Sequence, residues 1–172
     1  MHIMDILQNS LGANATEIGL DVVLDSEKDT LTLIFKDNGC GMDEGMVKNV
    51  INPFFTTRTT RKVGLGLPLL KQNTEMTGGS MSIESQVGVG TTVTAVFGLT
   101  HIDTPPMGDL TGTMALTISA NPGIRFLFHY KRDDEVDYLL DTNEVYEILD
   151  GMSIHDPNVI ESLKEMILEN IR

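Results

Sequence analysis

Three closely spaced glycine pairs constrain the fold of this 172-residue chain more than any other feature of its sequence. They are Gly39-x-Gly41, Gly64-x-Gly66 and Gly88-x-Gly90. Because glycine has no Cβ, the backbone at such places can turn tightly and approach another group closely. The pairs therefore mark three loops that can fit tightly around a ligand, although each pair alone also fits an ordinary turn.

The first 99 residues alternate between helical and strand patterns. Ile3, Met4, Leu7 and Leu11 recur at helical spacing, whereas later segments show the composition of strands. The order of elements predicts an α/β (α+β) two-layer sandwich with a mixed sheet and helices on one face. The predicted elements are helices over 2–14, 43–50 and 64–76, and strands over 18–24, 30–36, 80–85 and 91–97.

Residues 100–172 predict a separate α+β appendage that packs on this sandwich. A connector over 104–108 precedes two strand-like runs, 113–119 and 124–131, which flank the turn sequence Asn121-Pro122-Gly123. We expect a third strand over 135–140 and two helices after it. The first begins at Asp141 and Glu144, which resemble a capping box, and ends at Gly151. The second runs from Asp156-Pro157 to Ile171 with an apolar face of Ile160, Leu163, Ile167, Leu168 and Ile171.

Charge is distributed unevenly along the chain. The net charge is −13, and residues 1–99 carry 11 acidic and 7 basic side chains, whereas residues 100–172 carry 14 and 5. This balance disfavours nonspecific nucleic-acid binding. Three cations nevertheless lie close together at Arg58, Arg61 and Lys62. They fit either an anionic ligand or a solvated loop.

The single cysteine, Cys40, excludes an internal disulfide framework and a multi-cysteine metal site. The sequence contains neither an apolar run of the roughly 18 residues that a membrane span needs nor a secretory pattern at its start. A cytoplasmic location is therefore the expectation.

Several polar residues have types and spacings that suit nucleotide chemistry. A carboxylate accepts hydrogen bonds, so Asp37 suits the exocyclic amine of adenine. Gly64-x-Gly66 at the start of a helix suits phosphate, because free N–H groups and the helix dipole favour anions. Asp5 and Asn9 share one side of the first helix, where an amide oxygen can bind magnesium and a carboxylate can activate water. A solvated helix face is the alternative, and His2 there fits a polar helix end better than a phosphoacceptor or a metal ligand.

Five motifs combine these features in a fixed order along the chain. They are Asp5-x3-Asn9, Asp37-x-Gly39-x-Gly41, Pro53-Phe54-Phe55-Thr56-Thr57-Arg58, Gly64-Leu65-Gly66-Leu67 and Gly88-x-Gly90-Thr91. The set resembles the N, G1, F, G2 and G3 boxes of the GHKL superfamily, which includes gyrase-type topoisomerases, ninety-kilodalton heat-shock chaperones, sensor histidine kinases and mismatch-repair ATPases. Residues 53–97 look most like the ATP-binding domain of histidine kinases, and the resemblance covers residues 2–99.

The resemblance implies the Bergerat fold, with ATP and Mg²⁺ held between a helical layer and a lid. Asn9 would coordinate magnesium, Asp37 would accept from the adenine amino group, and Thr91 would reach Asp37 through a water. The remaining implied ligand contacts are Gly39, Gly41 and Ala13 around the base, Gly64, Leu65, Gly66 and Leu67 near the phosphates, Phe54 and Phe55 as lid anchors, and Arg58, Arg61 and Lys62 as phosphate sensors in a lid over 56–63.

The function implied is a histidine-kinase-like catalytic domain that transfers the γ-phosphoryl group of ATP to a histidine on another segment or protein. No phosphoacceptor motif precedes the first helix, so the acceptor would be a dimerisation segment or a partner, and the chain is either an excised domain or a stand-alone protein. A homodimer is a further option. The alternatives are a nucleotide-switched interaction module and a slow ATPase in which Asp5 is the general base.

Overall fold

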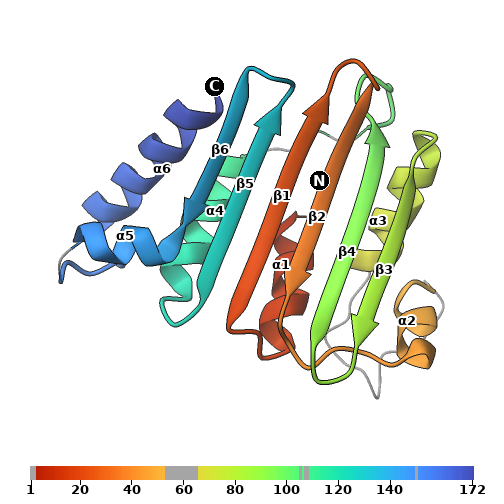
Figure 1. The fold of residues 1–172 in the computed structure, drawn as a ribbon, viewed down its shortest axis with the longest axis horizontal. Helices are drawn as coiled ribbons and strands as arrows, with labels where there is room; N and C mark the ends of the chain where they lie inside the picture. Colours follow the sequence, from red (N-terminus) through yellow and green to blue (C-terminus); the bar gives the residue numbers. More distant parts are fainter. Residues whose placement is uncertain (1–2, 53–65, 105, 107–108, 150) are drawn as a thin grey trace.

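The fold is a six-stranded sheet whose helices lie behind it or at its two ends, so that its front face is uncovered (Figure 1). The computed structural model describes residues 3–52, 66–104, 106, 109–149 and 151–172, which we call the described residues. The elements are α1 (Ile3–Gly12), β1 (Glu17–Asp25), β2 (Thr30–Asp37), α2 (Glu44–Val50), α3 (Gly66–Met76), β3 (Ser80–Gln86), β4 (Gly90–Gly98), α4 (Leu110–Ala120), β5 (Arg125–Arg132), β6 (Val136–Asp141), α5 (Thr142–Leu149) and α6 (Pro157–Ile171).

The strands follow the order β3-β4-β2-β1-β5-β6 across the sheet. Strands β1 and β5 pair in parallel, while the other four neighbouring pairs are antiparallel. The prediction of a mixed sheet with helices on one face is therefore confirmed. Because β5 and β6 come from the C-terminal part of the chain, one sheet runs through both predicted units. The boundary at residue 99 stays a prediction.

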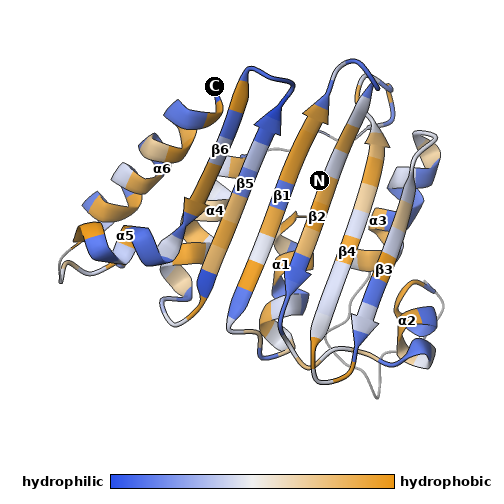
Figure 2. Cartoon of the chain, in the orientation of Figure 1, coloured by the Kyte–Doolittle hydropathy of each residue, from blue (hydrophilic) through white to orange (hydrophobic). Residues whose placement is uncertain are grey.

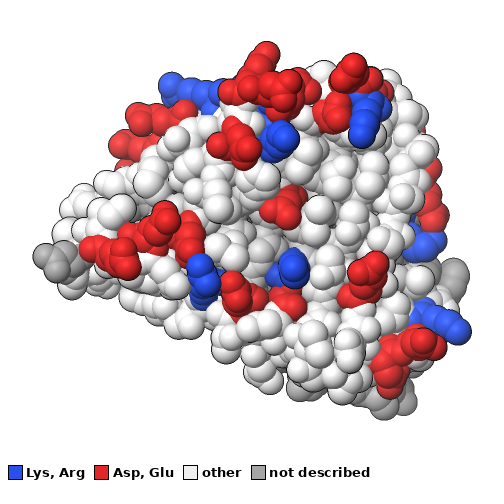
Figure 3. All heavy atoms as spheres, in the orientation of Figure 1, with Lys and Arg blue, Asp and Glu red and all other residues white. Residues whose placement is uncertain are grey.

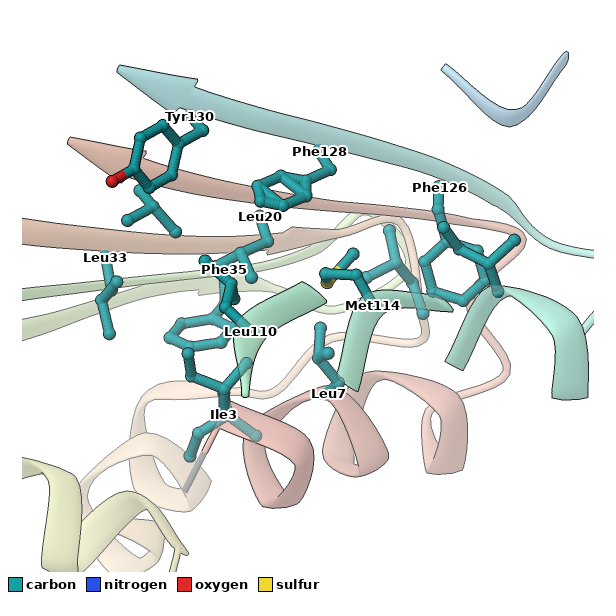
Figure 4. Close-up of a cluster of buried hydrophobic side chains, with 14 of the residues drawn as sticks. Ile3, Leu7, Leu20, Leu33, Phe35, Leu110, Met114, Phe126, Phe128 and Tyr130 are labelled. Atoms are coloured by element: carbon teal, nitrogen blue, oxygen red, sulfur yellow. The ribbon is translucent and has the colours of Figure 1, made fainter. Parts of the chain in front are cut away.

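The core lies between the sheet and the helices α1 and α4. Alternate residues of each strand face it, as Leu20, Phe35 and Phe128 do, since neighbouring side chains of a strand point to opposite faces. Figure 4 shows these side chains directed toward Leu7 of α1 and Met114 of α4, which are 0% and 1% exposed. Helix α1 is thereby fixed against β2, which positions its polar residues.

The helix starts follow the predicted capping chemistry. Asp43 accepts a hydrogen bond from the backbone N–H of Met46 at 2.8 Å and caps α2. Asp156 accepts from the N–H of Asn158 at 2.8 Å and precedes Pro157, the first residue of α6. These caps satisfy N–H groups that have no partner inside a helix.

The prediction of a strand over 113–119 was wrong, because these residues belong to helix α4. Asp109 caps this helix through the N–H of Gly112 at 2.8 Å. The real hairpin of the C-terminal region pairs β5 with β6, and Asn121-Pro122-Gly123 joins a helix to a strand. The appendage therefore contains three helices and a hairpin among the described residues. Helix α4 is buried on several sides, with Leu110, Gly112, Met114, Ala115, Thr117, Ile118 and Ser119 all buried, which removes the one-sided pattern that predicts a surface helix.

The last helix buries a slightly different face from the one predicted. Leu163 and Ile167 are buried, but so is Val159, whereas Leu168 is 42% exposed. Asp141 accepts from the N–H of Asn143 at 3.0 Å at the start of α5, in accord with the predicted capping role of its side chain. None of the helices in the described part of the chain has the length and apolar character needed to cross a membrane.

Candidate functional site

Asp37 is the last residue of β2, and its carboxylate lies on the helix-covered side of the sheet. Ser10 of α1 donates from Oγ to Oδ2 at 2.8 Å, and the backbone N–H of Gly39 donates to Oδ1 at 2.9 Å. A carboxylate has about four acceptor positions, so both oxygens can accept further hydrogen bonds. The half-buried group is thus held in one orientation and is still able to accept from a ligand.

The loop after Asp37 is packed tightly against the end of α1. A Cβ on Gly39 would lie 2.8 Å from both the Cβ and the carbonyl oxygen of Ala13. The N–H of Cys40 donates to that same carbonyl at 2.9 Å. Asn38 joins the loop to the start of β1, because its Oδ1 accepts from the N–H groups of Thr16 at 2.8 Å and of Glu17 at 3.0 Å. The structure therefore brings Ala13, Asp37 and Gly39 together.

The first and third glycine pairs meet each other. Gly41 has a φ of +72°, and a Cβ there would lie 2.0 Å from the carbonyl oxygen of Gln86. A Cβ on Gly90 would lie 2.1 Å from the carbonyl oxygen of Asp37. The N–H of Gly88 donates to the carbonyl oxygen of Cys40 at 2.8 Å. The close approach that these glycines permit is thus first of all an approach between two loops of the chain.

Thr91 lies directly across from Asp37 in the pairing of β2 with β4. Its Oγ1 lies 2.7 Å from Oγ of Ser85 on β3, within hydrogen-bond distance. Ser85 Oγ accepts from the N–H of Met42 at 2.8 Å and lies 3.1 Å from the carbonyl of Gly90. The hydroxyl groups and Asp37 therefore share one edge of the covered face.

The polar side of α1 meets the start of α3. A Cβ on Gly66 would lie 3.3 Å from Cδ1 of Ile6 and 3.4 Å from the Cβ of Asp5. Asn9, one turn after Asp5, is half-buried. The N-terminus of α3, which favours anions, is therefore next to the helix that carries Asp5 and Asn9. Leu67, the following residue, is 4% exposed and belongs to the hydrophobic core.

Two residues of this region, Ser10 and Ser85, were not predicted from the sequence. Ser10 shares the buried side of α1 with Ile3 and Leu7, and Ser85 follows Met81 and Ile83 on the covered side of β3. Polar residues in such apolar rows need hydrogen-bond partners, and this is the signal that could have identified them. The predicted residues Phe54, Phe55, Arg58, Arg61, Lys62, Gly64 and Leu65, together with His2, lie outside the described residues.

A hollow of about 510 Å³ lies on the uncovered face of the sheet, and its lining also includes Asp37, Ser85 and Thr91. Its side walls include Glu17, Lys36 and Glu84, and Gly19 leaves space at its floor. Acidic and basic side chains are mixed across this face (Figure 3). Since strand side chains alternate between faces, the Asp37 carboxylate points away from this hollow.

A family model described as "Histidine kinase-, DNA gyrase B-, and HSP90-like ATPase" matches residues 2–101, more than half of the chain. The chain belongs to this family. Among its curated relatives in the family, a putative sensor protein of Shewanella frigidimarina is 36% identical over 104 residues, and a sensor histidine kinase of Bacillus subtilis is 30% identical over 97 residues. These alignments cover 59% and 54% of this chain but only 16% and 17% of the relatives, so the chain spans about a sixth of their length.

The similarity of this fold to solved structures extends beyond residues 2–101, which the family model matches. The fold of this family member is similar to that of the Aquifex aeolicus MutL ATPase domain complexed with ADP, with a TM-score of 0.53 and 15% identity over 86% of this chain and 67% of that one. The N-terminal domain of a DNA repair protein gives a TM-score of 0.54 and 17% identity over 81% of this chain and 50% of that one. Residues 2–101 thus match a family of histidine-kinase-like ATPases, and they lie within a fold that includes the C-terminal strands.

Proposed function

We propose that this chain binds ATP between α1, the loop 37–41 and the start of α3, and transfers the γ-phosphoryl group to a histidine on another segment or protein. The observation that carries the proposal is the oriented Asp37 carboxylate, which can still accept a hydrogen bond. Similarity to sensor histidine kinases supports the transfer activity.

The base would lie against Ala13, Gly39 and Gly41, with its exocyclic amine donating to Asp37. Thr91 would support this contact through a water, because it lies across from Asp37 and its hydroxyl is already oriented by Ser85. The phosphates would extend toward the N-terminus of α3, where N–H groups favour anions. The lid residues Arg58 and Lys62 would neutralise phosphate charge.

Asn9 would hold a magnesium ion. Its amide oxygen is a hard ligand of the kind that Mg²⁺ accepts, and the helix that carries it contacts the proposed phosphate end of the site. When bound there, the ion would neutralise charge that develops on the phosphates. The remaining contribution of the protein is to position ATP relative to the acceptor and to exclude water.

Replacement of the predicted adenine acceptor tests the binding site. Asp37→Asn should lower ATP affinity by about tenfold, since one acceptor oxygen becomes a donor. Inosine triphosphate lacks the exocyclic amine, so its affinity should change far less. Calorimetry with both nucleotides measures the effect, and an unchanged preference for ATP would show that Asp37 does not read the base.

Transfer is tested with γ-labelled ATP and candidate histidine-bearing partners. Acid-labile label on a partner supports the kinase. Release of free phosphate by the wild type, but not by the Asp5→Asn variant, identifies the slow ATPase instead. Nucleotide binding without either labelled partner or free phosphate identifies a nucleotide-switched module. Because binding is measured separately, loss of transfer alone does not affect the assignment of the ATP site.

A further inference from the structure

Helices α5 and α6 leave an apolar groove between them at the far end of the sheet from α3. The groove has a volume of about 300 Å³. Val145, Val159 and Leu163 form its buried floor. Figure 2 shows apolar residues along both helices, interspersed with hydrophilic ones.

The mouth of the groove exposes side chains that normally avoid water. Ile148 is 77% exposed and Met152 is 57% exposed. The half-buried Met166 is a third apolar side chain at this groove. Contiguous exposed apolar groups rimmed by polar residues commonly mark an interaction surface. Methionine side chains adapt their shape to an incoming surface, which suits such a role.

The residues that line the groove are uncharged, and acidic side chains lie beside them on both helices. Residues 142–172 contain seven acidic and two basic side chains. Exposed Glu144 lies one turn before Ile148 on α5, while exposed Glu165 and Glu169 lie one turn after Ser162 and Met166 on α6. Figure 3 shows acidic side chains over α5 and, beside basic ones, toward the C-terminal end of α6. An occupant with basic flanks is therefore favoured.

We propose that this groove binds an amphipathic helix of a partner protein, with Leu-like residues on one side and Lys or Arg on its flanks. Two helices present a groove that a third helix fills with residues spaced at i, i+3, i+4 and i+7. A second copy of this chain is a poorer occupant, because its net charge of −13 would place like charges across the contact. The proposal does not depend on the assignment of the ATP site.

A model peptide tests the proposal. The probe is a labelled 14-residue helix of Leu and Lys with leucines at the amphipathic spacing, and its binding to the full chain is followed by fluorescence anisotropy. Two control peptides are used: one with Lys replaced by Glu, and one with the same composition in a scrambled order. We expect the amphipathic Lys peptide to bind the most tightly, and binding to weaken at high salt as the charges are screened.

Matched variants locate the binding site. The double variant Ile148→Ser and Met152→Ser should bind the probe about tenfold more weakly, whereas Ile102→Ser, which changes an apolar side chain that is 94% exposed elsewhere, should not change the affinity. All three positions are exposed, so we expect the variants to stay folded. Methyl NMR signals of Met152 and Met166 should shift on binding, and that of Met81 on β3 should not.

Three results would overturn the proposal. Equal affinity for the double variant and the wild type would show that the peptide binds elsewhere on an acidic protein. Equal affinity for the Glu peptide and the Lys peptide would show that the acidic residues beside the groove do not select a basic partner. Dimerisation in sedimentation experiments that is abolished by the double variant would show that a second copy of the chain occupies the groove.

Discussion

At the scale of the residue, one hydroxyl group orients the Asp37 carboxylate. Ser10 donates to Oδ2 from the buried side of α1, and the Gly39 N–H occupies one position on Oδ1. Without Ser10 the carboxylate would gain rotational freedom that a ligand would have to remove. Ser10 is therefore a positioning residue for the proposed adenine contact.

Ser10→Ala should weaken ATP binding about fivefold, or ~1 kcal/mol, because a hydrogen bond to a charged group is lost. Ser119→Ala is a matched control, since Ser119 is also a buried helical serine, and its Oγ donates to the carbonyl of Leu116 at 3.0 Å. Calorimetry should show the effect with ATP but not with inosine triphosphate. A loss of the same size for both nucleotides would indicate a general structural role.

At the scale of the element, the β5–β6 hairpin is closed by an ion pair between its two ends. Arg125 donates to Asp141 through Nε at 3.0 Å and through Nη2 at 2.5 Å. These hydrogen bonds lower the pKa of Asp141 below its ordinary value, and the carboxylate also accepts from the N–H of Asn143 in the first turn of α5. The pair therefore connects the strand hairpin to the helix that lines the groove.

This lowered pKa predicts a pH dependence of stability. The stabilisation by Asp141 is fully present above the ordinary aspartate pKa of about 3.9 and is lost as the pH falls through the lower native value. Asp141→Asn should therefore be less stable than the wild type at pH 7, and the difference should shrink as the pH falls below the ordinary aspartate pKa. Urea unfolding across this range measures it, with Asp134→Asn in the β5–β6 turn as the control. A difference that persists at the lowest pH would assign the effect to packing.

At the scale of the whole molecule, the parallel pairing of β1 with β5 joins the family-matched residues to the C-terminal part. Leu20 and Phe128 are directly paired in this register, and they are 1% and 0% exposed. Helix α4 adds a second connection, since Thr117 Oγ1 lies 3.5 Å from Sδ of Met4 on α1. We therefore expect the chain to unfold as one cooperative unit.

Phe128→Ala should lower the stability of the entire chain by about 3 kcal/mol, the usual cost of a large core truncation. Leu139→Ala on β6 changes a side chain that is 61% exposed, so it should stay within about 0.5 kcal/mol of the wild type. Circular dichroism and release of a fluorescent ATP analogue should report the same melting temperature. Two separate transitions would favour independent domains divided near residue 99.

The sequence by itself determined the family motifs and most of the elements of residues 1–99. Local chemistry sufficed there, because α1 and the strands have one-sided apolar patterns and Asp43 is a clear helix cap. The tertiary structure alone decided the state of α4. That helix packs against α1 and α6 as well as contributing Met114 and Ile118 to the core under the sheet, so its buried residues lie on several sides and carry no periodic signal.

The tertiary structure also decided what the glycine pairs do. The spacing of the glycines indicates that the backbone at Gly41 and Gly90 closely approaches another group, but it does not identify that group. In the fold, the partners include Gln86 and Asp37 at the ends of strands β3 and β2. The contacts of Ser10 with Asp37 and of β1 with β5 likewise join residues far apart in the chain. A sequence specifies such contacts only through the packing of the whole core, and for that reason they emerged only from the structure.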